Sequence, residues 1–269
     1  MGRPKRSAVQ KYHDRVAGIY DDSYDDAYWA WHDALTWDHI KPHLPRDLRA
    51  PVVDLGCGTG KWGAKLHKTG FHVTFVDISA QMLDQARLKL VEQGAPERTT
   101  FVHTDLMDMS LIPDGAFALA LAMGDPIGCT EQPRRAMREI RRVLAPGGVL
   151  VATFDNRLAA MDYYLDKGDA EQLGAFLRDG RTHWLTREKA EQFPIATFTP
   201  RGVVKLAEGA GFEVIDMIGK TVLPMRHHRE LLSTPESRRE WARVERSLCR
   251  DPDAIGRASH IQAAMKAVD

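Results

Sequence analysis

The sequence is poor in cysteine and has no long apolar run. Its three cysteines, Cys57, Cys129 and Cys249, are odd in number and far apart, which argues against a disulfide-rich secreted scaffold and is typical of a reducing compartment. No apolar stretch approaches the roughly 20 residues that a membrane-spanning helix needs. The basic residues at positions 3–6 are followed by no apolar segment, so a secretory signal is not expected. We therefore expect a cytoplasmic protein without a membrane partner.

A net charge is absent as well. The 37 lysines and arginines offset 37 aspartates and glutamates, so no overall basic field draws nucleic acid to the chain. The arginines of segment 131–144 share their helix with Glu131 and Glu139, which is typical of a solvated face. Nucleic acid is therefore not an expected partner. Hydrophobic residues make up 43% of the 269 positions, enough for the core of one large α/β domain with additions or of two small ones.

The most informative stretch is a strand–turn–helix–strand pattern over residues 51–79. The run 52–55 is short, apolar and rich in β-branched residues, which predicts a buried strand. A glycine-rich turn, an amphipathic helix and a second strand that ends at Asp77 follow it. Such a βαβ unit has a ligand site at the carboxyl edge of its strands. The glycines let a ligand lie against the backbone, and the acid can accept hydrogen bonds from ribose hydroxyls.

The glycine turn fits more than one nucleotide-binding pattern. A dinucleotide fingerprint can be read at Gly58, Gly60 and Gly63, so a nicotinamide-dependent oxidoreductase stays an alternative. The phosphate-loop pattern fails, because Leu55 stands where its first glycine is required. Read from the strand, the turn is G-x-G-x-G with an acid two residues upstream. In this form the run 54–60, Asp-Leu-Gly-Cys-Gly-Thr-Gly, resembles motif I of the class I S-adenosylmethionine-dependent methyltransferases.

A second run carries the same resemblance. Residues 142–148, Arg-Val-Leu-Ala-Pro-Gly-Gly, are similar to the run that follows the fourth strand and one helix in this family. The resemblance implies S-adenosylmethionine as cofactor, S-adenosylhomocysteine as product and a small-molecule methyl acceptor. Members that methylate amino groups of DNA or RNA usually carry an Asn/Asp-Pro-Pro-aromatic motif, from which this chain departs because Ile127 follows Pro126.

The resemblance also implies how the cofactor is held. The glycine loop approaches its amino-acid part, Asp77 holds its ribose, and Asp105, just after the third strand, lies beside its adenine. A tyrosine-containing segment before the sheet often folds over the cofactor, and Tyr20 is the candidate here. The residues expected at the cofactor are Tyr20, Asp54, Gly56, Cys57, Gly58, Gly60, Asp77, Ile78, Met82, Thr104, Asp105, Leu106, Met123 and Gly124.

The remaining pattern predicts a doubly wound α/β fold with a seven-stranded, Rossmann-like sheet, mostly parallel, whose last strand is antiparallel. Ser79 is the expected N-cap of a helix, and Thr199-Pro200 open another. Further strands are expected at 99–103, at 116–122, at the end of 144–151 and at 212–218, with 220–223 as the last, antiparallel hairpin partner. Further helices are expected at 80–93, 131–144 and 199–209.

Three segments are expected to extend a methyltransferase domain of residues 49–224. Residues 1–48, rich in aromatics and acids and broken near Gly18 or the aspartate pairs, predict a helical lid, with packing onto the domain as the alternative. Residues 156–198 interrupt the βα rhythm and predict an acceptor lid containing two short strands, 182–186 and 195–198. The tail 225–269 is expected to be helical and either caps the domain or pairs two copies into a homodimer.

No residue stands out as a general base. Methyl transfer is an in-line displacement at an activated carbon, so positioning supplies most of the effect, and a base is needed only if the acceptor loses a proton. Asp125 and His183 are the first candidates for this base, and His227 and His228 are further candidates. Asp125 could equally well be the cap of a turn. No metal is expected, because the two adjacent histidines point apart. A cofactor-binding protein without an acceptor pocket stays a third functional class.

Overall fold

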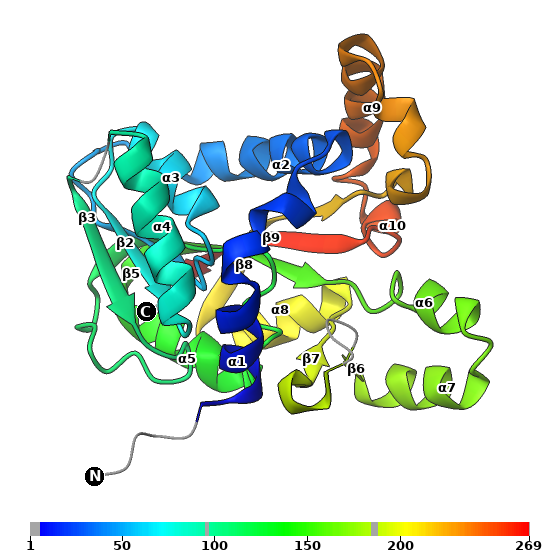
Figure 1. The fold of residues 1–269 in the computed structure, drawn as a ribbon, viewed down its shortest axis with the longest axis horizontal. Coiled ribbons are helices and arrows are strands. Elements are labelled where there is room, and N and C mark those ends of the chain that lie inside the picture. Colours follow the sequence, from blue (N-terminus) through cyan, green and yellow to red (C-terminus); the bar gives the residue numbers. More distant parts are fainter. Residues whose placement is uncertain (1–5, 95–96, 184–187, 269) are drawn as a thin grey trace.

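A seven-stranded sheet organises the fold, in a computed structural model that describes residues 6–94, 97–183 and 188–268 (Figure 1). The strands are β1 (Val52–Leu55), β2 (Val73–Asp77), β3 (Thr99–His103), β4 (Phe117–Ala122), β5 (Leu144–Asp155), β8 (Phe212–Lys220) and β9 (His260–Ala267). They lie in the order β3-β2-β1-β4-β5-β9-β8. The pairs among β1 to β5 are parallel, whereas β9 is antiparallel to both of its neighbours. The expected fold class is confirmed.

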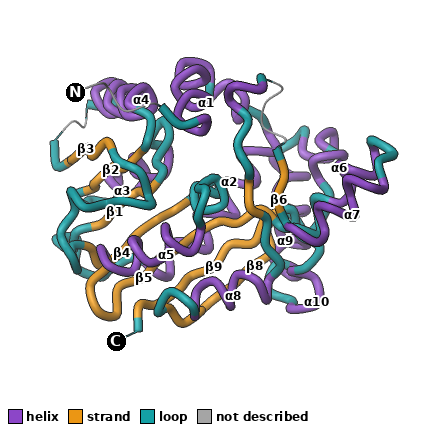
Figure 2. Tube along the Cα trace, turned by 90° about the horizontal axis from the view of Figure 1, so that it is seen from below, coloured by secondary structure: helices purple, strands orange, loops and turns teal. Residues whose placement is uncertain are grey.

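Helices cover both faces of this sheet. On one face lie α2 (Ala27–Ile40), α3 (Lys61–Lys68) and α4 (Ala80–Glu92), which share a buried apolar cluster with the strands. On the other lie α5 (Pro133–Val143) and α8 (Pro200–Glu208), seen in front of the sheet in Figure 2. The expected caps are present, since Ser79 accepts a hydrogen bond from the Met82 amide and Thr199 accepts one from the Gly202 amide.

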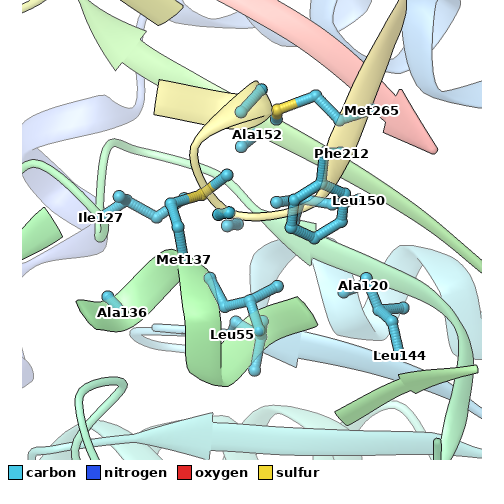
Figure 3. Close-up of a cluster of buried hydrophobic side chains, with 14 of the residues drawn as sticks. Leu55, Ala120, Ile127, Ala136, Met137, Leu144, Leu150, Ala152, Phe212 and Met265 are labelled. Atoms are coloured by element: carbon cyan, nitrogen blue, oxygen red, sulfur yellow. The ribbon is translucent and has the colours of Figure 1, made fainter. Parts of the chain in front are cut away.

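The core beneath α5 shows why this sequence selects this layering. Ala136 and Met137 of α5 point toward Leu55 and Leu150 of the sheet, with Phe212 beside them (Figure 3). Ala136, Met137, Leu55 and Leu150 are completely buried. The arginines of α5 occupy its other faces, so the helix is held by its apolar stripe, as the sequence pattern indicated.

The expectation for the last strand was wrong. Residues 220–223 do not form the hairpin partner, because Lys220 ends β8 and the partner of β8 is β9, which lies within the tail expected to be helical. The helical expectation holds for α9 (Pro235–Leu248) and α10 (Pro252–Ile255). The sequence of β9, HIQAAMKA, has no strong strand propensity of its own. It becomes a strand because small side chains fit between β5 and β8, where both faces of the strand are buried.

The insert forms a projection at one end of the sheet (Figures 1 and 2). It contains α6 (Met161–Asp166), α7 (Ala170–Asp179) and a two-stranded sheet of β6 (Arg181–Thr182) and β7 (Ile195–Ala196). Both strands are shorter than expected, and positions 184–186 of the first expected strand lie outside the described residues. At the N-terminus α1 (Ala8–Val16) precedes the short 3-10 helices η1 (Ala17–Ile19) and η2 (Asp21–Tyr24), which gives the expected break. The other 3-10 helices are η3 (Lys41–His43), η4 (Lys189–Glu191), η5 (Met225–His227) and η6 (Arg229–Leu232).

Candidate cofactor and acceptor site

The glycine loop between β1 and α3 is a left-handed turn with one open side. Gly56, Gly58 and Gly60 have φ of +60°, +53° and +79°, a region that glycine adopts without steric cost. A Cβ on Gly56 would lie 2.3 Å from the Cβ of Pro126, so this glycine lets the loop pack against the turn after β4. A Cβ on Gly58 would meet no atom nearer than Cε1 of Tyr20, 4.0 Å away. Apart from the Tyr20 ring, the loop is therefore open at Gly58, and a ligand that contacts Gly58 there would also contact Tyr20.

Two buried carboxylates fix the shape of this loop. Asp54 accepts a hydrogen bond from the Gly63 amide (2.7 Å), and burial raises the pKa of Asp54 to about 7. Asp77 accepts from the Gly58 amide through Oδ2 and from the Ser79 amide through Oδ1, both at 2.8 Å. Burial raises the pKa of Asp77, and hydrogen bonds from the Ser79 and Gly58 amides lower it. Asp54 thus holds the loop in place from the buried side. Asp77 retains lone pairs that can accept hydrogen bonds from ribose hydroxyls.

The N-terminal segment is bonded directly to the cofactor loop. The Thr59 hydroxyl donates to Asp21 (2.6 Å), and Lys89 of α4 pairs with the same carboxylate at 2.7 Å. The Ser79 hydroxyl, beside Asp77, donates to Asp14 of α1 (2.6 Å). Val16 and Ala17 pack with Tyr12 and Tyr20 on Met82, which is completely buried. Met82 therefore supports residues 12–20, which lie over the glycine loop. The sequence did not indicate Asp14, Asp21 or Lys89 as site residues, because their hydrogen bonds and salt bridge join segments that are distant in the chain.

The positions after β3 lie at the same edge of the sheet. The Thr104 amide donates to the carbonyl of Asp77 (3.0 Å), which joins the ends of β2 and β3. Asp105 is half-buried and accepts a hydrogen bond from the Met107 amide (2.8 Å), so it caps a turn beside the position implied for adenine. The carbonyl of Ile78 bonds to the His103 ring at 2.8 Å, and the side chains of Leu106 and Cys57 are buried.

Asp125 joins the ends of β4 and β5. It has a φ of +59° directly after Gly124 at +82°, and its carboxylate accepts from the amides of Gly128 (3.0 Å) and Asp155 (3.3 Å). Burial, reinforced by the Asp155 charge, raises the pKa of Asp125 well above its usual range. This geometry matches the turn-cap role. Met123, before the turn, accepts a bond from the Thr153 hydroxyl through its sulfur (3.6 Å).

The histidines considered as bases lie elsewhere. His183 lines a cavity of about 660 Å³ within the insert, next to Tyr164 and Phe176, and that cavity includes no residue of the glycine loop. His227 and His228 are exposed in the segment after β8. The structure therefore gathers the expected cofactor residues at one edge and leaves these three histidines away from it.

A cluster of buried and half-buried polar side chains at the ends of β5, β9 and β8 was not predicted from the sequence. Asp155, His260 and Lys220 are cross-strand neighbours in the sheet register. Nε2 of His260 lies 3.4 Å from Oδ1 of Asp155, and Lys220 donates to the hydroxyls of Thr36 (3.0 Å) and Thr153 (3.2 Å). Burial lowers the pKa of Lys220 to about 7 and raises that of Asp155 to about 6. The cluster was missed because β9 was not recognised, although a polar residue ending each apolar strand is a readable signal.

His39, His43 and Asp216 have side chains of the kind that bind metals and lie within 4.8 Å of one another. Gln262, however, donates to Nδ1 of His39 (3.0 Å), which leaves the ring proton on Nε2, facing Asp216 at 3.3 Å. Asp216 also pairs with Arg250 at 2.6 Å. Asp216 therefore already has a cationic partner in Arg250, and the Nε2 atoms of His39 and His43 lie 3.3 and 3.6 Å from its carboxylate.

Comparison with known proteins identifies the domain. A family described as "Methyltransferase domain" matches residues 52–148. A demethylmenaquinone methyltransferase of Clavibacter sepedonicus is 35% identical over 100 residues, which cover 37% of this chain and 39% of that protein. A tRNA 5-carboxymethoxyuridine methyltransferase of Escherichia coli K12 is 26% identical over 238 residues, 86% of each chain.

Similarity in structure extends over almost the whole chain. A geranyl diphosphate C-methyltransferase of Streptomyces coelicolor A3(2), solved with Mg²⁺, geranyl diphosphate and S-adenosyl-L-homocysteine, has a TM-score of 0.57 at 14% identity, over 99% of this chain and 86% of that one. At such identity the likeness establishes the fold alone. The matching family, the strand order and the glycine loop held by Asp54 and Asp77 together identify residues 52–148 as a methyltransferase domain of the class I S-adenosylmethionine-dependent type.

Proposed function

We propose that the protein transfers the methyl group of S-adenosylmethionine to a small-molecule acceptor by in-line displacement. The observation that carries the proposal is the open side of Gly58, bounded by Asp77 below and Tyr20 above. A ribose can be held by Asp77, and the sulfonium can lie near the electron-rich face of an aromatic ring. The chain's own part is then to orient both reactants and exclude water, since the sulfonium already activates the carbon.

Residues 8–24 cover the cofactor edge of the sheet rather than leaving it open. The bonds of Asp14 and Asp21 to the cofactor edge hold residues 8–24 over it, and Arg15 pairs with Glu191 of the insert at 2.8 Å. A covered site favours a small acceptor over a macromolecule. Among the residues the structure describes, no helix is long and apolar enough to cross a membrane.

RNA is the second candidate acceptor, favoured by a separate observation. A groove of about 470 Å³ lies between α5 and the insert, and the arginines that line it are Arg134, Arg135, Arg138, Arg157 and Arg181. The groove also contains Glu131 and Asp179, so its charge is mixed. The relative with the longest alignment described above is named for a tRNA substrate, and arginines commonly contact RNA phosphates.

The test compares both acceptors with one labelled cofactor. Protein incubated with methyl-labelled S-adenosylmethionine and a deproteinised metabolite extract is expected to place the label in a small molecule, whereas purified bulk tRNA should stay unlabelled. Calorimetry should detect S-adenosylhomocysteine binding and no NAD binding. Label in tRNA would replace the first candidate by the second. NAD binding without S-adenosylhomocysteine binding would contradict both.

We further propose that the lid is confined to residues 8–24. Helix α2 belongs to the core, since Ile40 is completely buried and Tyr28, Trp31 and Leu35 pack against the segment that follows β8. Amides of residues 12–24 are therefore expected to gain protection from hydrogen exchange when S-adenosylhomocysteine is added, because the ligand fills the space under Tyr20. Amides of α2 should be protected with or without it. Equal protection of residues 12–24 in both states would show a permanently closed segment and exclude the lid.

A further inference from the structure

Two histidines and an aspartate converge where α2 meets the outermost strand of the sheet. His39 lies in the last turn of α2, and His43 ends η3 four residues further along the chain, a spacing that puts both on one face of a helix. Asp216 belongs to β8, the edge strand, which α2 contacts directly (Figure 1). One nitrogen of each histidine and one oxygen of the carboxylate all lie within 4.8 Å of one another.

An irregularity in β8 turns Asp216 toward this helix. Val214 pairs with Met265 of β9 and Asp216 pairs with Ala264, so one residue of β8 is left over in a β-bulge. Met265 and Val214 pack in the apolar cluster beneath α5, whereas Ala264 belongs to the cluster on the α2 side. Without the bulge, Asp216 would share the face of Val214, because side chains alternate along a strand. The bulge therefore moves the carboxylate to the face where the two histidines lie, and bulges commonly re-aim a side chain in this way.

The histidine nitrogens that face Asp216 are too far from it for good hydrogen bonds. Nε2 of His39 lies 3.3 Å from Oδ2 of Asp216, and Nε2 of His43 lies 3.6 Å from the same oxygen. Both nitrogens are buried, and neither has a hydrogen-bond partner among the residues that the structure describes. An N–H···O bond is usually about 2.7–3.2 Å long, whereas two ligands at about 2.0–2.1 Å from a tetrahedral zinc ion are about 3.3–3.4 Å apart. The observed distances are closer to the second value.

The remaining polar atoms of the group have partners of the kind that orient metal ligands. Oδ1 of Asp216 accepts a hydrogen bond from Arg250 at 2.6 Å, which directs Oδ2 at the histidines. Nδ1 of His39 lies 3.0 Å from the side-chain amide of Gln262, whose Oε1 is buried without a partner in the described part of the chain. A half-turn of this amide lets Oε1 accept a proton from Nδ1, in exchange for its bond to the Thr36 carbonyl. Metal-bound histidines are usually held by such an acceptor.

The group lies close enough to the surface for an ion to reach it. The His39 side chain is 1% exposed, whereas Asp216 is 22% exposed and Arg250 is 55% exposed. An ion can therefore reach Oδ2 when the Arg250 side chain moves, and the buried Nε2 atoms complete its coordination. The charge of Arg250 opposes a cation, but solvent screens a charge with this exposure. Two imidazoles and one carboxylate suit an ion of the zinc type, whereas Mg²⁺ prefers oxygen ligands and an octahedral shell.

We propose that His39, His43 and Asp216 bind a divalent transition-metal ion of the zinc type, with water as the fourth ligand of a tetrahedral shell. Nε2 of each histidine gives its lone pair to the ion, and the ring proton of His39 moves from Nε2 to Nδ1 through solvent. The ion joins the C-terminal end of α2 to the edge strand of the sheet. Its role is structural, since β4, β5 and β9 lie between β8 and the strand that carries the glycine loop.

The first test is calorimetric titration of the full chain, treated with a chelator, with Zn²⁺ and with Mg²⁺ as probes. Zinc is expected to bind and Mg²⁺ to give no binding heat. His43→Gln and Asp216→Asn should each weaken zinc binding by more than the 10- to 100-fold that loss of a neighbour of a metal ligand typically costs. His72→Gln is the matched control, because His72 is exposed before β2 and should leave the affinity unchanged. Equal zinc affinity in all four proteins, or equal binding of Mg²⁺, would overturn the site.

The second test uses the wild-type protein alone, so it does not depend on the folding of a variant. Long-range proton–nitrogen NMR should place the His39 proton on Nε2 without zinc and on Nδ1 with saturating zinc. Co²⁺ in place of zinc should give the intense visible absorption of a tetrahedral complex. A His39 proton that stays on Nε2 would place any bound zinc elsewhere, and the weak absorption of octahedral Co²⁺ would overturn the proposed coordination.

Thermal melts and cofactor binding separate this inference from the proposed function. Zinc should raise the Tm of the wild type and leave that of Asp216→Asn unchanged, because an ion that binds only the folded state stabilises it. The affinity for S-adenosylhomocysteine should be the same with and without zinc. Failure to bind S-adenosylhomocysteine would contradict methyl transfer and leave the metal site intact. Failure to bind zinc would remove the metal site and leave methyl transfer intact.

Discussion

Replacing Gly58 with valine is expected to abolish measurable binding of S-adenosylhomocysteine while the protein stays folded. The new Cβ would enter the open side of the loop, where the protein's own nearest atom is 4.0 Å away and the ligand must lie. The expected loss in affinity is at least about 100-fold, or about 3 kcal/mol. Calorimetry would measure the affinity, and circular dichroism with a thermal melt would check the fold.

The control for this variant must carry the same backbone strain. A β-branched residue at positive φ costs about 1–2 kcal/mol wherever it stands. Gly94 has a φ of +65° and no neighbouring atom within 4 Å of a new Cβ, so Gly94→Val carries that strain at the end of α4, away from the loop. Gly56→Val is a poor probe, because its Cβ would collide with Pro126. Affinity in Gly58→Val equal to that in Gly94→Val would contradict the loop assignment.

Replacing Asp77 with alanine is expected to weaken S-adenosylhomocysteine binding by on the order of 2–3 kcal/mol, since a charged acceptor for ribose hydroxyls is lost. The variant should also be less stable by about 1–3 kcal/mol, because the amides of Gly58 and Ser79 lose their buried acceptor. Calorimetry well below the melting temperature separates the two effects.

The control for Asp77 is another aspartate that caps a turn. Asp108 accepts a hydrogen bond from the Ser110 amide at 3.2 Å but is exposed, so Asp108→Ala removes a comparable side-chain bond. The hydrogen bonds that join Asp108 to Thr104 and Asp105 involve its backbone and are kept in this variant. Its affinity for S-adenosylhomocysteine should equal that of the wild type. Unchanged affinity in Asp77→Ala would move the ribose contact to another residue and leave Asp77 with its structural bonds alone.

Local signals explain which parts of the fold and the site were predictable. The loop from Gly56 to Gly60 and the acid at Asp77 could be read because each depends on residues a few positions apart, where turn geometry and strand ends leave a pattern. The same holds for the Ser79 cap of α4. These elements also form the first βαβ unit, whose spatial arrangement follows from chain order.

Contacts between distant segments explain what was not predictable. Residues 260–267 form the strand β9 because they lie between β5 and β8. The local sequence of these residues does not indicate that position. The pairing of Asp155 with His260 depends on the register between β5 and β9, so it could not be predicted without that strand. The salt bridge between Asp21 and Lys89 likewise joins segments that the sequence keeps apart.

The position of β9 imposes an order on the assembly of the protein during synthesis. The strands β1 to β5 emerge from the ribosome early and can pair with one another, which completes the nucleotide half of the molecule. The free side of β5 then stays unpaired until the insert, β8 and α9 have been made and residues 260–267 arrive. A chain released before residue 260 therefore has the glycine loop but an incomplete sheet, in which one side of β5 still lacks its partner strand.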